Sequence, residues 1–140
     1  MPVPCDLQVL EQISFKVVEA SPDAKIVIDE NGIVIIFNAQ AELLFGYARE
    51  EVIGQELEML LPEERREIHK DHRAFYFDAP QIREMGAGKI LEGQHRSGRK
   101  FLVQIKLAPL SPVPGQGVHA LAVVRRVAPN NPILKEKEKE

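Results

Sequence analysis

Hydrophobic and polar positions alternate with two different periods along the chain, and the first period is helical. From residue 6 to residue 20 we predict an α-helix, because Asp6 suits an N-cap and Ser21-Pro22-Asp23 stops the pattern. One side of this predicted helix carries Leu7, Leu10, Ser14, Val17 and Val18.

Two β-branched runs follow the predicted helix. They cover residues 25–29 and 33–38, and Glu30-Asn31-Gly32 joins them. Asn-Gly between two such runs is a strong hairpin signal, because both residue types accept positive φ angles. We therefore predict a β-hairpin in this part of the chain.

Three helical stretches are predicted in the middle of the chain. Residues 39–45 form a short helix that ends at Gly46, and residues 48–55 contain a helical turn. A longer helix runs from about residue 63 to residue 78. Pro62 lies near its first turn, where a missing N–H costs nothing, and Gly86 and Gly88 stop the pattern.

Period-two alternation returns in the last third of the chain. Residues 100–107 alternate most clearly, and residues 89–96 and 117–127 are predicted as further strands. One face of the middle strand has Phe101, Val103, Ile105 and Leu107. The order of elements predicts an α+β domain, in which a five-stranded antiparallel sheet has short helices on one face and an N-terminal flanking helix.

Composition and charge narrow the functional classes. The chain has 140 residues and a net charge of −3, with 44% hydrophobic and 28% charged residues, as in ordinary globular proteins. No basic stripe supports nucleic-acid binding, and the longest apolar run, residues 33–37, is too short to cross a membrane. Since the N-terminus has no signal-peptide pattern and Cys5 is the single cysteine, we expect a reduced, cytoplasmic protein without disulfides.

We divide the chain into three parts. Residues 1–20 are the flanking helix, residues 21–128 form one folded domain, and residues 129–140 are a polar tail or linker. The last part is assigned from its prolines and its run of charged residues, which are typical of segments without a packed core.

Several short motifs occur together in one family. "SPDAKIVIDENGIVIIFN" joins a Ser-Pro-Asp turn to a hairpin with Asp-x-x-Gly and to an Asn that starts a helix. Gly-Tyr and Val-Ile-Gly follow, and "RSGRKF" matches a later hairpin. With these motifs, residues 17–127 resemble the PAS sensory domain. The resemblance implies a signalling domain, whose chamber between helices and sheet holds haem, flavin, an organic acid or only side chains.

Two histidines in the predicted long helix are the main candidates for chemistry. At 3.6 residues per turn, Ile68, His72 and Phe75 lie close together, and Tyr76 and His69 extend that face to one side. Periodicity thus predicts both histidines on the buried side, with His72 nearer the middle. A histidine there is usually a hydrogen-bonded residue at the edge of a core, and this interpretation stays open.

A closer resemblance concerns the oxygen-sensing haem-PAS domains of two-component histidine kinases. The spacing from His69 to Gly86, Gly88 and Phe101 is similar to that from their iron-binding histidine. The resemblance therefore implies His69 as the iron ligand, and hence as the metal-binding residue if haem binds, whereas periodicity favours His72. The candidate cofactor-binding residues are His69, His72, Tyr76, Met85, Lys89, Val103, Ile105 and Leu107.

Two positions depart from the haem-binding pattern. Those sensors have an arginine that responds to bound oxygen where this chain has Lys89, and an arginine near a haem propionate where it has Phe75. Ile105 and Leu107 match the aliphatic positions over the gas-binding face, as a dry haem pocket requires. The cofactor stays open, with haem as the sharper hypothesis.

Other chemistries have less support in the sequence. His69 and His72 lack a nearby cysteine or a third ligand for zinc. Flavin photochemistry in light-sensing PAS domains needs a cysteine after the short helices, and Cys5 lies elsewhere, so flavin is not expected. Without a Gly-x-Ser-x-Gly motif, a phosphate loop or convincingly spaced carboxylates, we do not expect an enzyme.

Two functional hypotheses follow. In the first, a sensory domain binds a small ligand and signals through dimer or partner contacts. In the second, a ligand-free PAS module serves protein interaction, and side chains fill its chamber. The apolar stripe of the first helix has two candidate partners, the open face of the sheet and the same helix of a second chain. For either hypothesis we predict a homodimer through this helix, and an effector or kinase domain is expected outside this chain.

Overall fold

The fold is built on one antiparallel sheet. The structure, a computed structural model, describes residues 7–78, 83–85, 91–110, 115 and 117–128. The strand order is β2-β1-β6-β5-β3, and β4 also pairs with β5. The strands are β1 (Ala24–Asp29), β2 (Val34–Phe37), β3 (Arg83–Met85), β4 (Leu91–Gln94), β5 (Lys100–Leu110) and β6 (His119–Arg126).

The short strands β3 and β4 share one edge of β5. Met85 lies opposite Ile105, Leu91 lies opposite Val103, and β6 occupies the other edge of β5. The two short strands thus fill a single strand position, and the predicted five-stranded antiparallel sheet is confirmed. Sequence patterns did not predict β3, since three residues are too few for a clear alternation.

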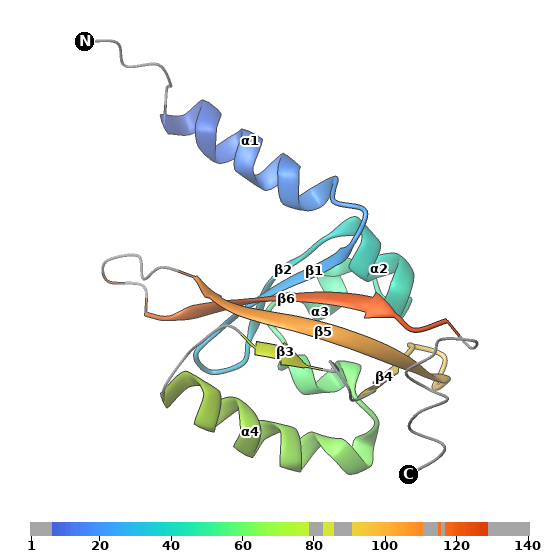
Figure 1. Ribbon diagram of the computed structural model, residues 1–140. Coiled ribbons are helices and arrows are strands. Elements are labelled where there is room, and N and C mark those ends of the chain that lie inside the picture. The colour runs from blue at the N-terminus through green and yellow to red at the C-terminus, as the bar shows by residue number, and fades with distance from the viewer. Residues whose placement is uncertain (1–6, 79–82, 86–90, 111–114, 116, 129–140) are drawn as a thin grey trace.

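Helices cover one face of the sheet, and one further helix projects away from it (Figure 1). The covering layer also contains two 3₁₀ helices, η1 and η2, of which η1 was not predicted. The helices are α1 (Leu7–Glu19), α2 (Ala39–Phe45), α3 (Arg49–Val52), η1 (Leu57–Leu60), η2 (Glu63–Arg65) and α4 (Arg66–Asp78). The projecting helix is α1.

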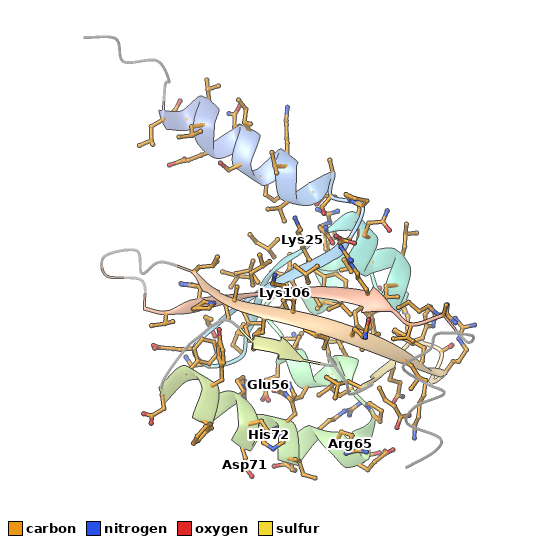
Figure 2. The ribbon with its side chains drawn as sticks, in the orientation of Figure 1. Lys25, Glu56, Arg65, Asp71, His72 and Lys106 are labelled. Carbon is orange, nitrogen blue, oxygen red and sulfur yellow. The ribbon has the colours of Figure 1, made fainter. Side chains whose placement is uncertain are left out.

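The core lies between the sheet and the covering helices. Inward side chains of β1, β2, β5 and β6 pack against Ala41, Phe45, Val52, Leu60 and Tyr76 of the helical layer. Rings of Phe37, Phe45 and Phe101 form a chain, with centroids 6.2 and 5.4 Å apart. Each fully buried apolar side chain of this size contributes about 1.5–3 kcal/mol to folding. Lys25 and Lys106 alternate with inward residues and lie on the opposite face (Figure 2).

The β1–β2 hairpin turns at the predicted place by a different device. Gly32 has φ +78°, but no non-glycine residue in the described part of the chain has a positive φ. The Asp29 carboxylate instead accepts hydrogen bonds from the N–H groups of Asn31 and Ile33, at 2.9 Å each. An aspartate that bonds to the backbone after it organises a turn in this way.

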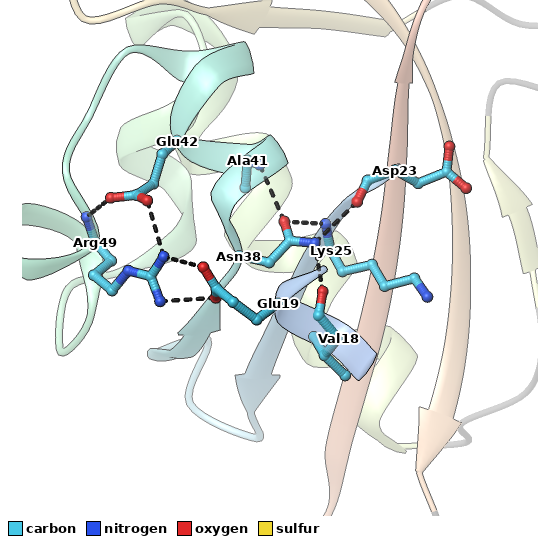
Figure 3. Close-up of polar contacts among 8 residues, drawn as sticks. All are labelled: Val18, Glu19, Asp23, Lys25, Asn38, Ala41, Glu42 and Arg49. Carbon is cyan, nitrogen blue, oxygen red and sulfur yellow. Dashed lines mark hydrogen bonds and ion pairs between the residues drawn. The ribbon is translucent and has the colours of Figure 1, made fainter. Parts of the chain in front are cut away.

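Asn38 joins three elements at one buried point (Figure 3). Its side-chain oxygen accepts hydrogen bonds from the N–H groups of Lys25 and Ala41, at 2.8 and 3.0 Å. Its amide nitrogen donates to the carbonyl oxygens of Val18 and Asp23, at 2.8 and 2.9 Å. Asn38 is therefore the N-cap of α2, as predicted, and it also ties the end of α1 to β1.

A second polar contact ties α1 to the helical layer. The Arg49 guanidinium binds both carboxylate oxygens of Glu19, and its Nη2 lies 3.0 Å from Glu42 Oε1 (Figure 3). The side-chain and backbone hydrogen bonds from Arg49 lower the pKa of the Glu42 carboxyl below its ordinary value. Together with Asn38, Arg49 fixes the C-terminal end of α1 to the domain.

The rest of α1 makes little contact with the domain. No residue of α1 is buried, and Leu7 and Val17 are 67% and 61% exposed. The predicted helix is confirmed, and most of its apolar side is exposed. Such a face on a helix usually serves association.

Candidate functional site

Helix α4 turns a different face toward the sheet from the one that periodicity predicted. Ile68 and Phe75 are 52% and 69% exposed, and His72 between them is exposed at the helix surface (Figure 2). Tyr76 is buried, and His69 is partly buried. The prediction that Ile68, His72 and Phe75 form the inward stripe is wrong.

Polar contacts with Glu58 accompany this rotation of α4. His69 Nδ1 lies 2.6 Å from Glu58 Oε2, and Arg73 Nη1 lies 3.3 Å from Glu58 Oε1. Glu58 belongs to η1 and is 2% exposed. A buried carboxylate costs free energy unless it is paired. The pairing of Glu58 with His69 and Arg73 therefore stabilises this orientation of α4 more than burial of Ile68 and Phe75 would stabilise the predicted one.

The Glu58 carboxyl is ionised at neutral pH. Burial raises its pKa, but the hydrogen bond with His69 and the positive charge of Arg73 act in the opposite direction, and the pKa lies below its ordinary value. An ionised carboxylate can only accept hydrogen bonds. Glu58 is therefore an anion that accepts a hydrogen bond from His69 and forms an ion pair with Arg73.

Arg73 extends this contact to the tip of the β1–β2 hairpin. Its Nη1 donates to the carbonyl oxygen of Asn31 at 2.6 Å. Its guanidinium also lies over Gly32, where an added Cβ would stand 1.3 Å from Nη1. The positive φ favours glycine at position 32, and a larger residue there would also have to displace this guanidinium. Helix α4, η1 and the hairpin are linked through one arginine.

Strand β5 supplies an aliphatic wall to the same core. Val103 is buried, and Ile105 and Leu107 are partly buried and pack against the core cluster that contains Tyr76. The predicted inward face of this strand is confirmed. Tyr76 of α4 and the aliphatic side chains of β5 therefore belong to the same core, and His69 of the same helix contacts Glu58.

Two sequence candidates fall at the limits of the described residues. Met85 is opposite Ile105 in the β3–β5 pairing, and Lys89 lies outside the described residues, as does Cys5. Phe75, which stands where the haem-binding subgroup has arginine, is at the exposed surface of α4. His72 is exposed as well, so periodicity no longer supports it as a ligand.

Sequence reasoning missed Glu58 and Arg73. A signal for Glu58 was present, because it is a single acidic residue within the apolar run Leu57–Leu61. A lone charge in such a run is buried with its neighbours and needs a partner. The partner itself could not be deduced, since Arg73 is one of several basic residues on the helix that follows.

The described part of the chain has neither a metal-ligand cluster nor a membrane-spanning helix. No group of three or more His, Cys, Asp or Glu side chains gathers there as a metal site. Nor does any helix in these ranges have the length and apolar character needed to cross a membrane.

The sequence as a whole matches a known family. A model of the PAS fold matches residues 15–127, and the chain belongs to the PAS family, a sensory fold. Sensor protein FixL from Bradyrhizobium diazoefficiens is 36% identical over 89 residues, which are 64% of this chain and 18% of FixL. Oxygen sensor protein DosP from Escherichia coli is 34% identical over 114 residues, which are 81% of this chain and 14% of DosP. The chain thus spans less than a fifth of either curated relative.

Solved structures agree on the fold. A PAS domain from Colwellia psychrerythraea is 24% identical with a TM-score of 0.69, covering 85% of this chain and 97% of its own. An RNA-binding Light-Oxygen-Voltage receptor is 17% identical with a TM-score of 0.77, covering 99% of this chain and 39% of its own. The Rhodobacter sphaeroides LOV protein is 15% identical with a TM-score of 0.71, covering 91% and 71%. At these identities the likeness shows the fold alone.

Proposed function

We propose that this chain is a sensor domain that binds haem through His69 and signals through dimer or partner contacts rather than by catalysis. The observation that carries the proposal is the contact of 2.6 Å between His69 Nδ1 and the buried Glu58 carboxylate. Histidines that bind metals commonly have their second ring nitrogen held by a carboxylate. The likeness to proteins named as a sensor and an oxygen sensor supports the same function.

The chemistry of the residues present fits a haem group. His69 has one ring nitrogen bound to Glu58, and no described residue forms a hydrogen bond with its Nε2. Ile105 and Leu107 supply an aliphatic surface of the kind that haem pockets use. When bound, haem would supply an iron that binds diatomic gases. Lys89 would recognise a bound gas less specifically than the planar fork of an arginine.

Replacing His69 should remove haem binding, while replacing His72 should not. We expect the His69→Ala protein to show no Soret band after haem titration, because the axial nitrogen is lost. The His72→Ala protein, changed at an exposed position of the same helix, should keep the band at wild-type intensity. Absorption spectra of the three proteins at equal concentration make the measurement.

Two outcomes would contradict this assignment. A wild-type protein that develops no Soret band with excess haem would exclude haem as the ligand. Loss of the band in His72→Ala but not in His69→Ala would mean that His72 is the ligand. Circular dichroism of each variant shows whether a lost band reflects a lost fold instead.

A ligand-free interaction module is the second candidate. The observation in its favour is the chain of rings from Phe37, Phe45 and Phe101, which fills space between the sheet and α2. Side chains rather than a ligand would then form the whole interior. This function would be favoured if the wild-type protein binds no haem but still forms a dimer.

We infer that the chain forms a homodimer through α1. Leu10, Phe15 and Val18 of α1 line a shallow hollow together with Ile36 of β2, and most of the apolar side of α1 is exposed. A second copy of α1 and its sheet would cover these surfaces by twofold symmetry. The contacts of Asn38 and Arg49 would hold α1 in a fixed orientation relative to the domain.

Substituting lysine at Leu10 should therefore weaken the dimer. We expect Leu10→Lys to raise the dimer dissociation constant about tenfold or more, because it buries a charge in an apolar interface. Leu43→Lys is the matched control, since Leu43 is 74% exposed on α2. Sedimentation velocity over a concentration series measures both. A wild-type monomer at high concentration, or equal effects of the two substitutions, would refute the interface.

A further inference from the structure

We propose that Glu58 is a positioning residue for His69, which keeps the ring proton on Nδ1 and leaves Nε2 with its lone pair, and that Arg73 holds Glu58 in place for this task. Only the identification of the ligand as haem rests on the proposed function. The assignment of the ring proton stands on the geometry of His69, Glu58 and Arg73.

The proton assignment follows from the contact itself. Glu58 Oε2 and His69 Nδ1 are 2.6 Å apart, which is the distance of a strong, charge-assisted hydrogen bond. The Arg73 guanidinium, with Nη1 3.3 Å from Glu58 Oε1, favours the ionised form of this buried carboxylate, which then has no proton to donate. Nδ1 must therefore be the donor. A free neutral imidazole prefers its proton on Nε2, so Glu58 reverses the ordinary preference.

Arg73 restrains the carboxylate through the oxygen that His69 does not contact. Its side chain is 13% exposed, and Nη1 lies 3.3 Å from Glu58 Oε1 and 2.6 Å from the Asn31 carbonyl oxygen. The guanidinium also rests on Gly32. Arg73 is thus fixed by the hairpin as well as by Glu58, and each carboxylate oxygen has one cationic or polar partner.

The arrangement favours ligands that accept an electron pair. With its proton on Nδ1 and a carboxylate behind it, the imidazole is more basic at Nε2, and partners of this kind commonly change metal affinity about 10–100-fold. The site would therefore bind iron, or another group that accepts an electron pair, at Nε2. It would disfavour a ligand that presents an anionic oxygen there.

The ring proton can be located in the protein without haem. In alkaline buffer, where an ordinary histidine is neutral, long-range ¹H–¹⁵N correlation spectra distinguish the two tautomers. We expect His69 to be protonated mainly on Nδ1 in the wild type and mainly on Nε2 in Glu58→Met, which has no acceptor. Exposed His72 on the same helix is the internal control, with its proton mainly on Nε2 in both proteins.

A wild-type spectrum in which His69 and His72 show the same preference would overturn the inference, and this result needs no variant. Glu58→Met with an unchanged His69 tautomer would also overturn it. If Glu58→Met does not fold, Glu58→Gln replaces it. Its carbonyl oxygen should face Arg73 and its NH₂ should face Nδ1, which moves the ring proton to Nε2. An unchanged tautomer in Glu58→Gln would likewise refute the role of Glu58.

Haem titration then tests the consequence for binding. We expect the haem dissociation constant of Glu58→Gln to be about 10–100-fold that of the wild type, with the fold retained. Equal constants would overturn the effect on ligand strength. If the wild type takes up no haem, the proposed function fails, whereas the tautomer measurement still decides the role of Glu58.

Discussion

The Asn38→Ala protein is expected to lose about 3–4 kcal/mol of its free energy of unfolding. Asn38 is fully buried, and its side chain makes four hydrogen bonds with backbone groups. Loss of the helix cap costs about 1 kcal/mol, and each of the three other hydrogen bonds, which are partly buried, contributes about 0.5–1.5 kcal/mol. Urea denaturation followed by circular dichroism measures the change.

Two further variants separate the functions of Asn38. Asn38→Asp keeps an oxygen that accepts from Lys25 and Ala41 but cannot donate to Val18 and Asp23, so it should retain the cap and loosen the end of α1. Asn31→Ala, at an exposed turn position, should cost less than about 0.5 kcal/mol. A similar cost for Asn38→Ala and Asn31→Ala would contradict the importance of the buried network.

The Gly32→Ala protein should be destabilised by about 3 kcal/mol. The backbone at position 32 has φ +78°, which costs a residue with a Cβ about 1–2 kcal/mol. The new Cβ would also displace the Arg73 guanidinium, since it would stand 1.3 Å from Nη1. A displaced guanidinium weakens its contacts with Glu58 and with the Asn31 carbonyl oxygen, which adds the remaining cost of about 1–2 kcal/mol. Thermal denaturation gives the measurement.

Gly54→Ala is the matched control for this substitution. Gly54 has φ +90°, but an added Cβ would meet nothing within 4 Å, so only the backbone strain of about 1–2 kcal/mol should appear. In an Arg73→Ala background, the additional cost of Gly32→Ala should fall to the level of Gly54→Ala. Equal costs of Gly32→Ala and Gly54→Ala in the wild-type background would contradict the prediction. They would show that the close contact between Arg73 and Gly32 adds nothing to stability.

The candidate site was only partly predictable, and the reason lies in α4. Resemblance to haem-PAS sensors pointed to His69, whereas apolar periodicity pointed to His72, and the structure places His69 on the inner side. Periodicity failed because the helix has few apolar residues and several long polar ones. In such a helix, the partner of a buried charge decides the rotation, and Glu58 is on another element.

Features that depend on neighbouring residues were determined by the sequence alone. The positions of the hairpin turn, the cap at Asn38 and the end of α2 at Gly46 follow from side-chain and backbone preferences within four residues. The inward face of β5 follows from strict alternation, which leaves a strand only two choices. These are the parts of the fold for which short-range chemistry is sufficient.

The tertiary structure decided the features that join distant residues. The pair His69 and Glu58 is separated by 11 residues, Arg73 and Asn31 by 42, and β3 becomes a strand only by pairing with β5. A buried carboxylate accepts any well-placed donor, so its partner depends on which side chains the completed fold brings within reach. Local patterns therefore determined where helices and strands form. The free-energy cost of leaving the buried Glu58 carboxylate unpaired determined which face of α4 became the interior.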